Sequence, residues 1–96
     1  MKKNVYAICD TLSGFVLGLD FSASEPERYV LDQNRENCMR PNPIARTVVF
    51  KQIGVLDDET LDGELFKIPV TVGDLSESVK KLEAYQNALK SNSKPL

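Results

Sequence analysis

The stretch FVLGLDF, residues 15–21, carries the clearest structural pattern in the chain. Phe15, Leu17, Leu19 and Phe21 alternate with other residues, and alternate residues of a β-strand lie on one face of its sheet. This period of two predicts a strand over residues 15–21. We expect its four apolar side chains to form one core face of the sheet.

The residues before this stretch predict a hairpin. VYAIC, residues 5–9, is rich in residues that favour strands. Asp10, Ser13 and Gly14 are turn formers, and glycine supplies the positive φ that a short hairpin loop needs. We therefore expect residues 5–9 to pair with residues 15–21.

A first helix is expected after the hairpin. Ser24 and Glu27 have the S-x-x-E spacing of a capping box, and Pro26 is tolerated in a first helical turn. The helix should end by Met39, because the prolines that follow at 41 and 43 cannot continue it. One side of this helix carries a weak apolar stripe formed by Val30, Leu31, Asn34 and Cys38. The stripe is weak because the polar Asn34 interrupts it.

Two more strands and a second helix complete the expected order. Residues 47–56 and 65–72 are predicted strands, and Pro69 marks the latter as an edge strand or a bulge. The order predicts an α+β fold, a small antiparallel sheet (β-β-α-β-β) with one helix packed on a face and a C-terminal helix. We expect a single domain over residues 1–90 and a flexible tail over residues 91–96.

The C-terminal helix is predicted over residues 74–90. Asp74 and Glu77 repeat the capping-box spacing, and an apolar seam with alternating steps of four and three residues follows them. About two heptads are too short for an isolated coiled coil, so the seam should dock on the sheet or on a second copy. The seam is the candidate oligomer interface: Leu75, Val79, Leu82, Gln86 and Leu89.

Composition excludes several kinds of site. The 96 residues include no His and two Cys, with a net charge of -2. Without His, neither Ser-His-Asp nor Cys-His nucleophile systems can be built within one chain, nor can mixed Cys/His zinc sites. Cys9 and Cys38 lack C-x-x-C spacing, and we expect both to be buried thiols in a reducing cytoplasm. We predict no catalytic residue, no metal site and no cofactor.

Two further features bear on partners. No run approaches the roughly 20 apolar residues of a membrane span, so no membrane partner is expected. The acidic segment DDETLDGE, residues 57–64, lacks the spacing of a calcium-binding loop. We interpret it as a solvated turn, with a weak cation contact as the alternative.

Positive charge is concentrated in the middle of this acidic chain. Residues 28–51 contain five cations against Asp32 and Glu36. Several of the cations lie beside aromatic residues, as in proteins that stack single-stranded bases; ordinary surface charge is the alternative. The candidate nucleic-acid-binding residues are Lys2, Lys3, Tyr6, Arg28, Tyr29, Arg35, Arg40, Arg46, Phe50 and Lys51.

Three segments also carry a family resemblance. They are VYAICDTLSGF (5–15), FSASEPE (21–27) and FKQIGVLDDET (50–60). Their order resembles the small nonstructural protein of gokushovirus-type microviruses, which are bacteriophages with circular single-stranded DNA genomes. The resemblance implies DNA binding in the bacterial host cytoplasm, at the stage when progeny strands are made and packaged. It supplies no catalytic residue.

The sequence supports two function hypotheses. The first is a non-enzymatic single-stranded DNA-binding phage protein acting in genome synthesis or packaging, with cations on phosphates and Tyr6, Tyr29 or Phe50 on bases. The alternative is a homodimeric protein-interaction module. It would use the C-terminal seam and an open sheet face to bind a second copy, or a capsid or host protein, without direct DNA contact.

Overall fold

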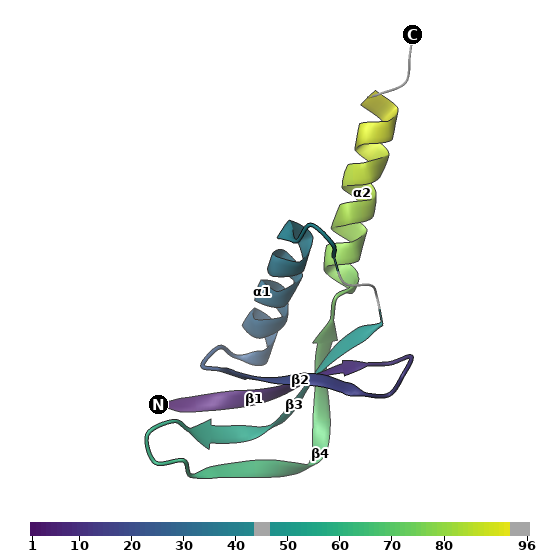
Figure 1. Cartoon of the computed structure of the whole chain (residues 1–96). Coiled ribbons are helices and arrows are strands. Elements are labelled where there is room, and N and C mark those ends of the chain that lie inside the picture. Colours follow the sequence, from purple (N-terminus) through teal and green to yellow (C-terminus); the bar gives the residue numbers. More distant parts are fainter. Residues whose placement is uncertain (44–46, 93–96) are drawn as a thin grey trace.

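The chain forms a four-stranded antiparallel sheet with two helices (Figure 1). The computed structural model describes residues 1–43 and 47–92, with side chains described up to residue 90. The sheet order is β2-β1-β3-β4, so β2 and β4 are its edges. The predicted α+β class and element order are confirmed. The elements are β1 (Lys2–Asp10), β2 (Val16–Ser22), α1 (Pro26–Met39), β3 (Val48–Asp57), β4 (Gly63–Asp74) and α2 (Ser76–Asn92).

The turn between β1 and β2 forms as the sequence predicts. The Asp10 carboxylate accepts hydrogen bonds from the N–H groups of Leu12 (3.3 Å) and Ser13 (3.2 Å), and from the Ser13 hydroxyl (2.7 Å). Gly14 has φ 74°, the left-handed conformation that glycine adopts without a Cβ penalty. These bonds close the hairpin and set the pairing of β1 with β2.

The start of α1 differs from the expected capping box. Pro26 occupies the first turn as predicted, but the N-cap is Glu25 and it makes no side-chain cap bond. The carbonyl of Ser24 instead accepts bonds from the Tyr6 hydroxyl (3.0 Å) and the Asn4 amide (3.1 Å). The capping-box prediction is therefore wrong, because this segment ties α1 to β1. The helix ends at Met39, as expected.

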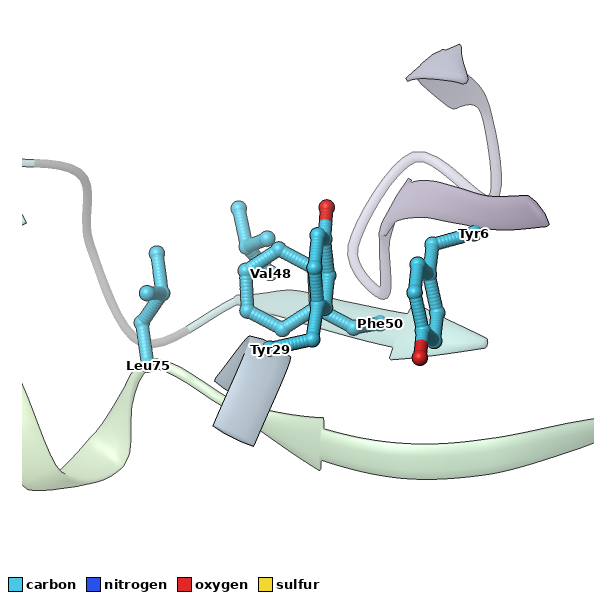
Figure 2. Packing of buried hydrophobic residues seen from close by; sticks show 5 residues of the cluster. All are labelled: Tyr6, Tyr29, Val48, Phe50 and Leu75. Atoms are coloured by element: carbon cyan, nitrogen blue, oxygen red, sulfur yellow. The ribbon is translucent and has the colours of Figure 1, made fainter. Parts of the chain in front are cut away.

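The core lies between α1 and one face of the sheet (Figure 2). Tyr6 and Tyr29 stack with ring centroids 3.9 Å apart, and Phe50 meets Tyr29 edge-on at 5.6 Å. Such aromatic pairs add stabilisation beyond the apolar area that they bury. Val48 and Leu75 complete the buried cluster.

The core face of β2 is the opposite of the expected one. Tyr6 pairs with Asp20 across the sheet, so Asp20 lies on the side facing α1, where its carboxylate accepts a hydrogen bond from the Tyr29 hydroxyl (3.0 Å). Leu19 and Phe21 point to the other side and are 55% and 50% exposed. The alternation correctly predicted a strand, but α1 covers the face that carries the polar residues of β2.

Buried polar residues join α2 to α1. The Asn34 amide donates to the Asp74 carbonyl (2.8 Å), and its oxygen accepts the Ser78 N–H (2.8 Å). Asn37 donates to the buried Ser78 hydroxyl at 2.7 Å. A side chain of α1 thus satisfies one of the free N–H groups at the start of α2. Asn34, which interrupts the apolar stripe in the sequence, is the link between the two helices.

Asp74 supports the same helix end and gives a pH-dependent prediction. The Ser76 hydroxyl and N–H donate to its carboxylate and hold its pKa below the ordinary 3.8. Because the pKa is lower in the folded state, this stabilisation is present above the unfolded-state pKa and is lost as pH falls through the folded-state pKa. We expect Asp74→Ala to lower the free energy of unfolding by about 1 kcal/mol near neutral pH. In urea titrations the difference from wild type should shrink below the ordinary pKa of 3.8; a constant difference at all pH values would contradict this role.

The second half of α2 extends beyond the rest of the chain (Figure 1). The Cα radius of gyration is 16.7 Å, against about 12–13 Å for a compact domain of this length. All side chains from residue 83 to residue 90 are exposed. The helix continues to Asn92, beyond the predicted end at Lys90; residues 93–96 of the expected tail lie outside the described residues.

Candidate protein-interaction surface

Within residues 1–43 and 47–92, no helix lies over one face of the sheet. In β1, residues at odd positions lie on this side, and the strand register places their partners in β2 and β3 beside them. Most of the side chains are apolar. We call this surface the open face: Val5, Ala7, Cys9, Val16, Leu19, Phe21, Val49, Lys51, Ile53 and Leu65.

Two hollows make the open face concave. The first, of about 380 Å³, is lined from all four strands and includes Leu19, Phe21 and Leu65. The second, of about 460 Å³, has Ala7 and Cys9 in its lining, and Ile53 contributes to both. Concave, mostly apolar surfaces of this kind are typical of binding sites rather than of ordinary protein surface.

The turn between β3 and β4 holds a leucine in an unfavourable conformation beside the first hollow. Leu61 has φ 63°, is 74% exposed and lines that hollow. A left-handed backbone costs a residue with a Cβ about 1–2 kcal/mol. In a single copy the Leu61 side chain is exposed, so burial of apolar surface does not offset this cost.

Glycine at this position should relieve the strain. We expect Leu61→Gly to raise the free energy of unfolding by about 1 kcal/mol, after glycine's extra entropy in the unfolded chain is subtracted. Leu65→Gly is the matched control, because Leu65 is equally exposed at 74% but lies in β4 with no positive φ. Urea unfolding should show a gain for the first variant and a loss for the second; a loss for both would contradict the strain.

The aromatic residues proposed to stack on bases are in the core. Tyr6, Tyr29 and Phe50 are at most 3% exposed. Burial, together with hydrogen bonding to Asp20, raises the pKa of Tyr29, and burial raises that of Tyr6. No ring face is left for a base, so the predicted stacking role of these three residues is wrong.

The predicted cations do not form one surface. Arg28 pairs with Asp32 at 3.1 Å, and Lys3 pairs with Asp58 at 3.5 Å. Lys51 lies on the open face, across the sheet from α1. Lys2 is exposed at the start of β1, Arg35 is exposed on α1, Arg40 is exposed just after it, and Arg46 lies outside the described residues.

The chain matches no protein-family model, no curated protein and no solved structure. The resemblance to the microvirus protein therefore stays a prediction. Neither α1 nor α2, within the described residues, is long and apolar enough to cross a membrane.

The C-terminal seam is partly buried in the fold and partly exposed to solvent. Leu75 is part of the buried cluster, so its predicted place in an oligomer interface is wrong. Val79 and Leu82 are half-buried, whereas Gln86 and Leu89 are exposed. Only the last two positions of the seam are fully available to a partner.

The acidic turn is occupied by charges of the chain itself. The N-terminal ammonium donates to Asp58 at 2.9 Å, which raises its own pKa and lowers that of Asp58. Asp57 accepts the N–H groups of Glu59 and Thr60, which lower its pKa. In the described part of the chain, no group of acidic residues and cysteines is arranged to hold a metal ion.

The two cysteines are free thiols on different layers. Cys9 lies on the open face, and Cys38 lies on α1 with its Sγ donating to the Ser78 carbonyl at 3.4 Å. Both are half-buried, so the prediction that they are buried thiols is wrong. Because Cys9 sits in the second hollow, its thiol reports on whether that hollow is covered.

Proposed function

We propose that this protein is a non-enzymatic protein-interaction module that forms a homodimer by burying its open face. The proposal rests on the exposure of three large apolar side chains of this face in a single copy, those of Leu19, Phe21 and Leu65. Full burial of such a side chain contributes about 1.5–3 kcal/mol. A sheet with one uncovered apolar face needs a second layer, and nothing in the described chain supplies it.

The face suits another apolar protein surface better than a charged ligand. Among the residues that define the open face, Lys51 is the charged one, whereas Asp10 and Glu64 line the hollows at the ends of the strands. The Lys51 ammonium makes no hydrogen bond or ion pair within the described residues. A lysine stem can pack along apolar surface while the ammonium reaches the rim. Burial of the face therefore does not require Lys51 to lose contact with water.

Alkylation of the native cysteines tests the proposal. In a homodimer that buries the open face, the rate of Cys9 modification by iodoacetamide should fall as protein concentration rises through the dissociation constant. Cys38, on the other side of the sheet, is the internal reference and should react at a constant rate. Mass spectrometry of the labelled peptides gives both rates. A rate of Cys9 modification that does not change with protein concentration up to the millimolar range would contradict the proposal.

Single-stranded DNA binding is a second candidate, favoured by two exposed arginines. Arg35 and Arg40 make no ion pair within the described residues. Without base stacking, such binding would rest on phosphate contacts, each worth a log–log salt slope of about -0.7. Replacing both arginines with glutamine should then reduce the slope by about 1.4 in a fluorescence titration with a labelled oligonucleotide. No binding by the wild-type chain at low salt would exclude this candidate.

A further inference from the structure

Leu61 is a strained and exposed leucine at one end of the open face. Its backbone is left-handed (φ 63°), and its N–H donates to the Asp57 carbonyl at 2.9 Å within the turn. Its side chain is 74% exposed and lines the first hollow. Strained backbone conformations cluster at functional sites, where the surrounding structure holds them in place. Leu61 therefore has the features of an apolar anchor that a partner buries.

The two hollows of the open face carry unpaired charges of opposite sign. Glu64 lines the first hollow and Lys51 lines the second, and neither charged group has a hydrogen bond or ion pair within the described residues. Asp10 also lines the second hollow, but its carboxylate already accepts bonds from Leu12 and Ser13. A surface with an unpaired anion at one end and an unpaired cation at the other is complementary to a second copy that runs in the reverse direction.

We propose, resting on the homodimer above, that the open faces of two copies stack with their strands in opposite directions, so that Leu61 of each copy enters the second hollow of the other. A two-fold axis that lies between the layers and crosses the strands at Ile53 gives this arrangement. Ile53 contributes to both hollows, so each first hollow then faces a second hollow. Two sheets that pack face to face with aligned strands form a β-sandwich. The second copy supplies the missing layer.

Positions along β3 match on the two sides of Ile53. Lys51 lies two residues before Ile53. Val55 lies two residues after it and pairs with Glu64 of β4. The two-fold axis therefore sets Lys51 of one copy level with Glu64 of the partner, and the contact occurs twice. An axis along the strands would instead gather both Lys51 ammonium groups at one end of the interface and both Glu64 carboxylates at the other.

The same rotation brings Leu61 to Cys9 of the partner. β3 ends at Asp57, four residues after Ile53, and Leu61 follows in the turn. Val49 lies four residues before Ile53 and pairs with Cys9 of β1. Leu61 thus enters the second hollow at the level of Cys9. Burial there offsets its backbone strain, so the gain in stability expected for Leu61→Gly applies at protein concentrations below the dissociation constant.

Disulfide formation with the native Cys9 tests this arrangement. In a Cys38→Ser background, Leu61→Cys should form an intermolecular disulfide with Cys9, identified by mass spectrometry of the linked peptides. Ile68→Cys is the matched control, because Ile68 is 79% exposed and lines neither hollow. We expect Leu61→Cys to cross-link roughly tenfold faster or more than the control under mild oxidation. Cys9 should not link to Cys9 of the partner, because the rotation sets these two thiols at opposite ends of the interface.

Exchange of the two charges is an independent test. Lys51→Glu and Glu64→Lys should each raise the dissociation constant roughly tenfold, because each sets like charges together at both symmetric contacts. The double variant restores opposite charges, so its dissociation constant should return to within about threefold of wild type. Sedimentation equilibrium measures these constants, and circular dichroism establishes that each variant is folded.

The outcomes separate this arrangement from the homodimer itself. A dimer in which Cys9 links to its own copy, or in which Leu61→Cys reacts no faster than Ile68→Cys, would overturn the reversed stacking and leave the homodimer standing. Additive losses in the double charge variant would do the same. A wild-type chain that sediments as a monomer at all concentrations would overturn both.

Discussion

Leu19→Glu will give a chain that is folded and monomeric. Leu19 is half exposed in the single copy, so a glutamate there keeps its carboxylate in water and the fold is preserved. In the dimer the same carboxylate would be buried among apolar side chains without a partner, which is costly. We expect the dissociation constant to rise by at least about a hundredfold, or about 2.8 kcal/mol. Sedimentation equilibrium measures this change.

Ile68→Glu is the matched control for that variant. Ile68 is 79% exposed on β4 and lines neither hollow of the open face. The same change of charge and size at this position should leave the dissociation constant within about threefold of wild type. Equal effects of the two variants would mean that net charge, rather than the open face, controls association.

Phe50→Ala will cause the largest loss of stability of any variant considered. Phe50 is 2% exposed and meets Tyr29 edge-on in the centre of the core. Deleting a buried phenylalanine typically costs about 3–5 kcal/mol, a large part of the 5–15 kcal/mol that stabilises a domain. Urea unfolding followed by circular dichroism should show this loss directly.

Phe15→Ala is the matched control for Phe50→Ala, because it removes the same aromatic ring from a position outside the core. Phe15 is 70% exposed next to the first hairpin turn, so its removal should change the free energy of unfolding by less than about 0.5 kcal/mol. If instead Phe50→Ala unfolded like wild type, Phe50 would be free to contact a ligand and the description of the core would be incorrect.

The sequence predicted the elements well because their signals are local. The alternation in residues 15–21, the turn formers at Asp10 and Gly14, and the proline in the first turn of α1 all act through neighbouring residues. Each of these features lies where it was expected. Pro69 likewise marked β4 as an edge strand.

The covered face of the sheet could not be predicted in the same way. Alternation shows which side chains share a face, but not which face α1 covers. Two apolar faces compete for one helix here, and the aromatic packing of Tyr6, Tyr29 and Phe50 decides the outcome. The apolar side of β2 is left exposed as a result.

The same alternation explains the failure of the stacking prediction. Phe50 and Lys51 are adjacent in the sequence, but consecutive residues of a strand point to opposite faces. Phe50 therefore enters the core while Lys51 lies on the open face. Adjacency of a cation and an aromatic residue indicates a shared binding surface only where the backbone keeps both on one side.

The role of Asn34 is not visible in the sequence. Asn34 looked like a defect in an apolar stripe, yet its amide joins the carbonyl of Asp74 and the N–H of Ser78. These bonds link residues 40 and 44 positions apart, so no local sequence pattern indicates them. They also explain why Leu75 belongs to the core and not to an oligomer seam.

The mass of the wild-type chain in solution shows whether a second copy covers the open face. One copy has a mass of 10.7 kDa. Sedimentation equilibrium over a range of concentrations should show a species of twice that mass for the wild-type chain and for Ile68→Glu, and a species of 10.7 kDa for Leu19→Glu. A wild-type chain that remains at 10.7 kDa at all concentrations would contradict the burial of the open face by a second copy.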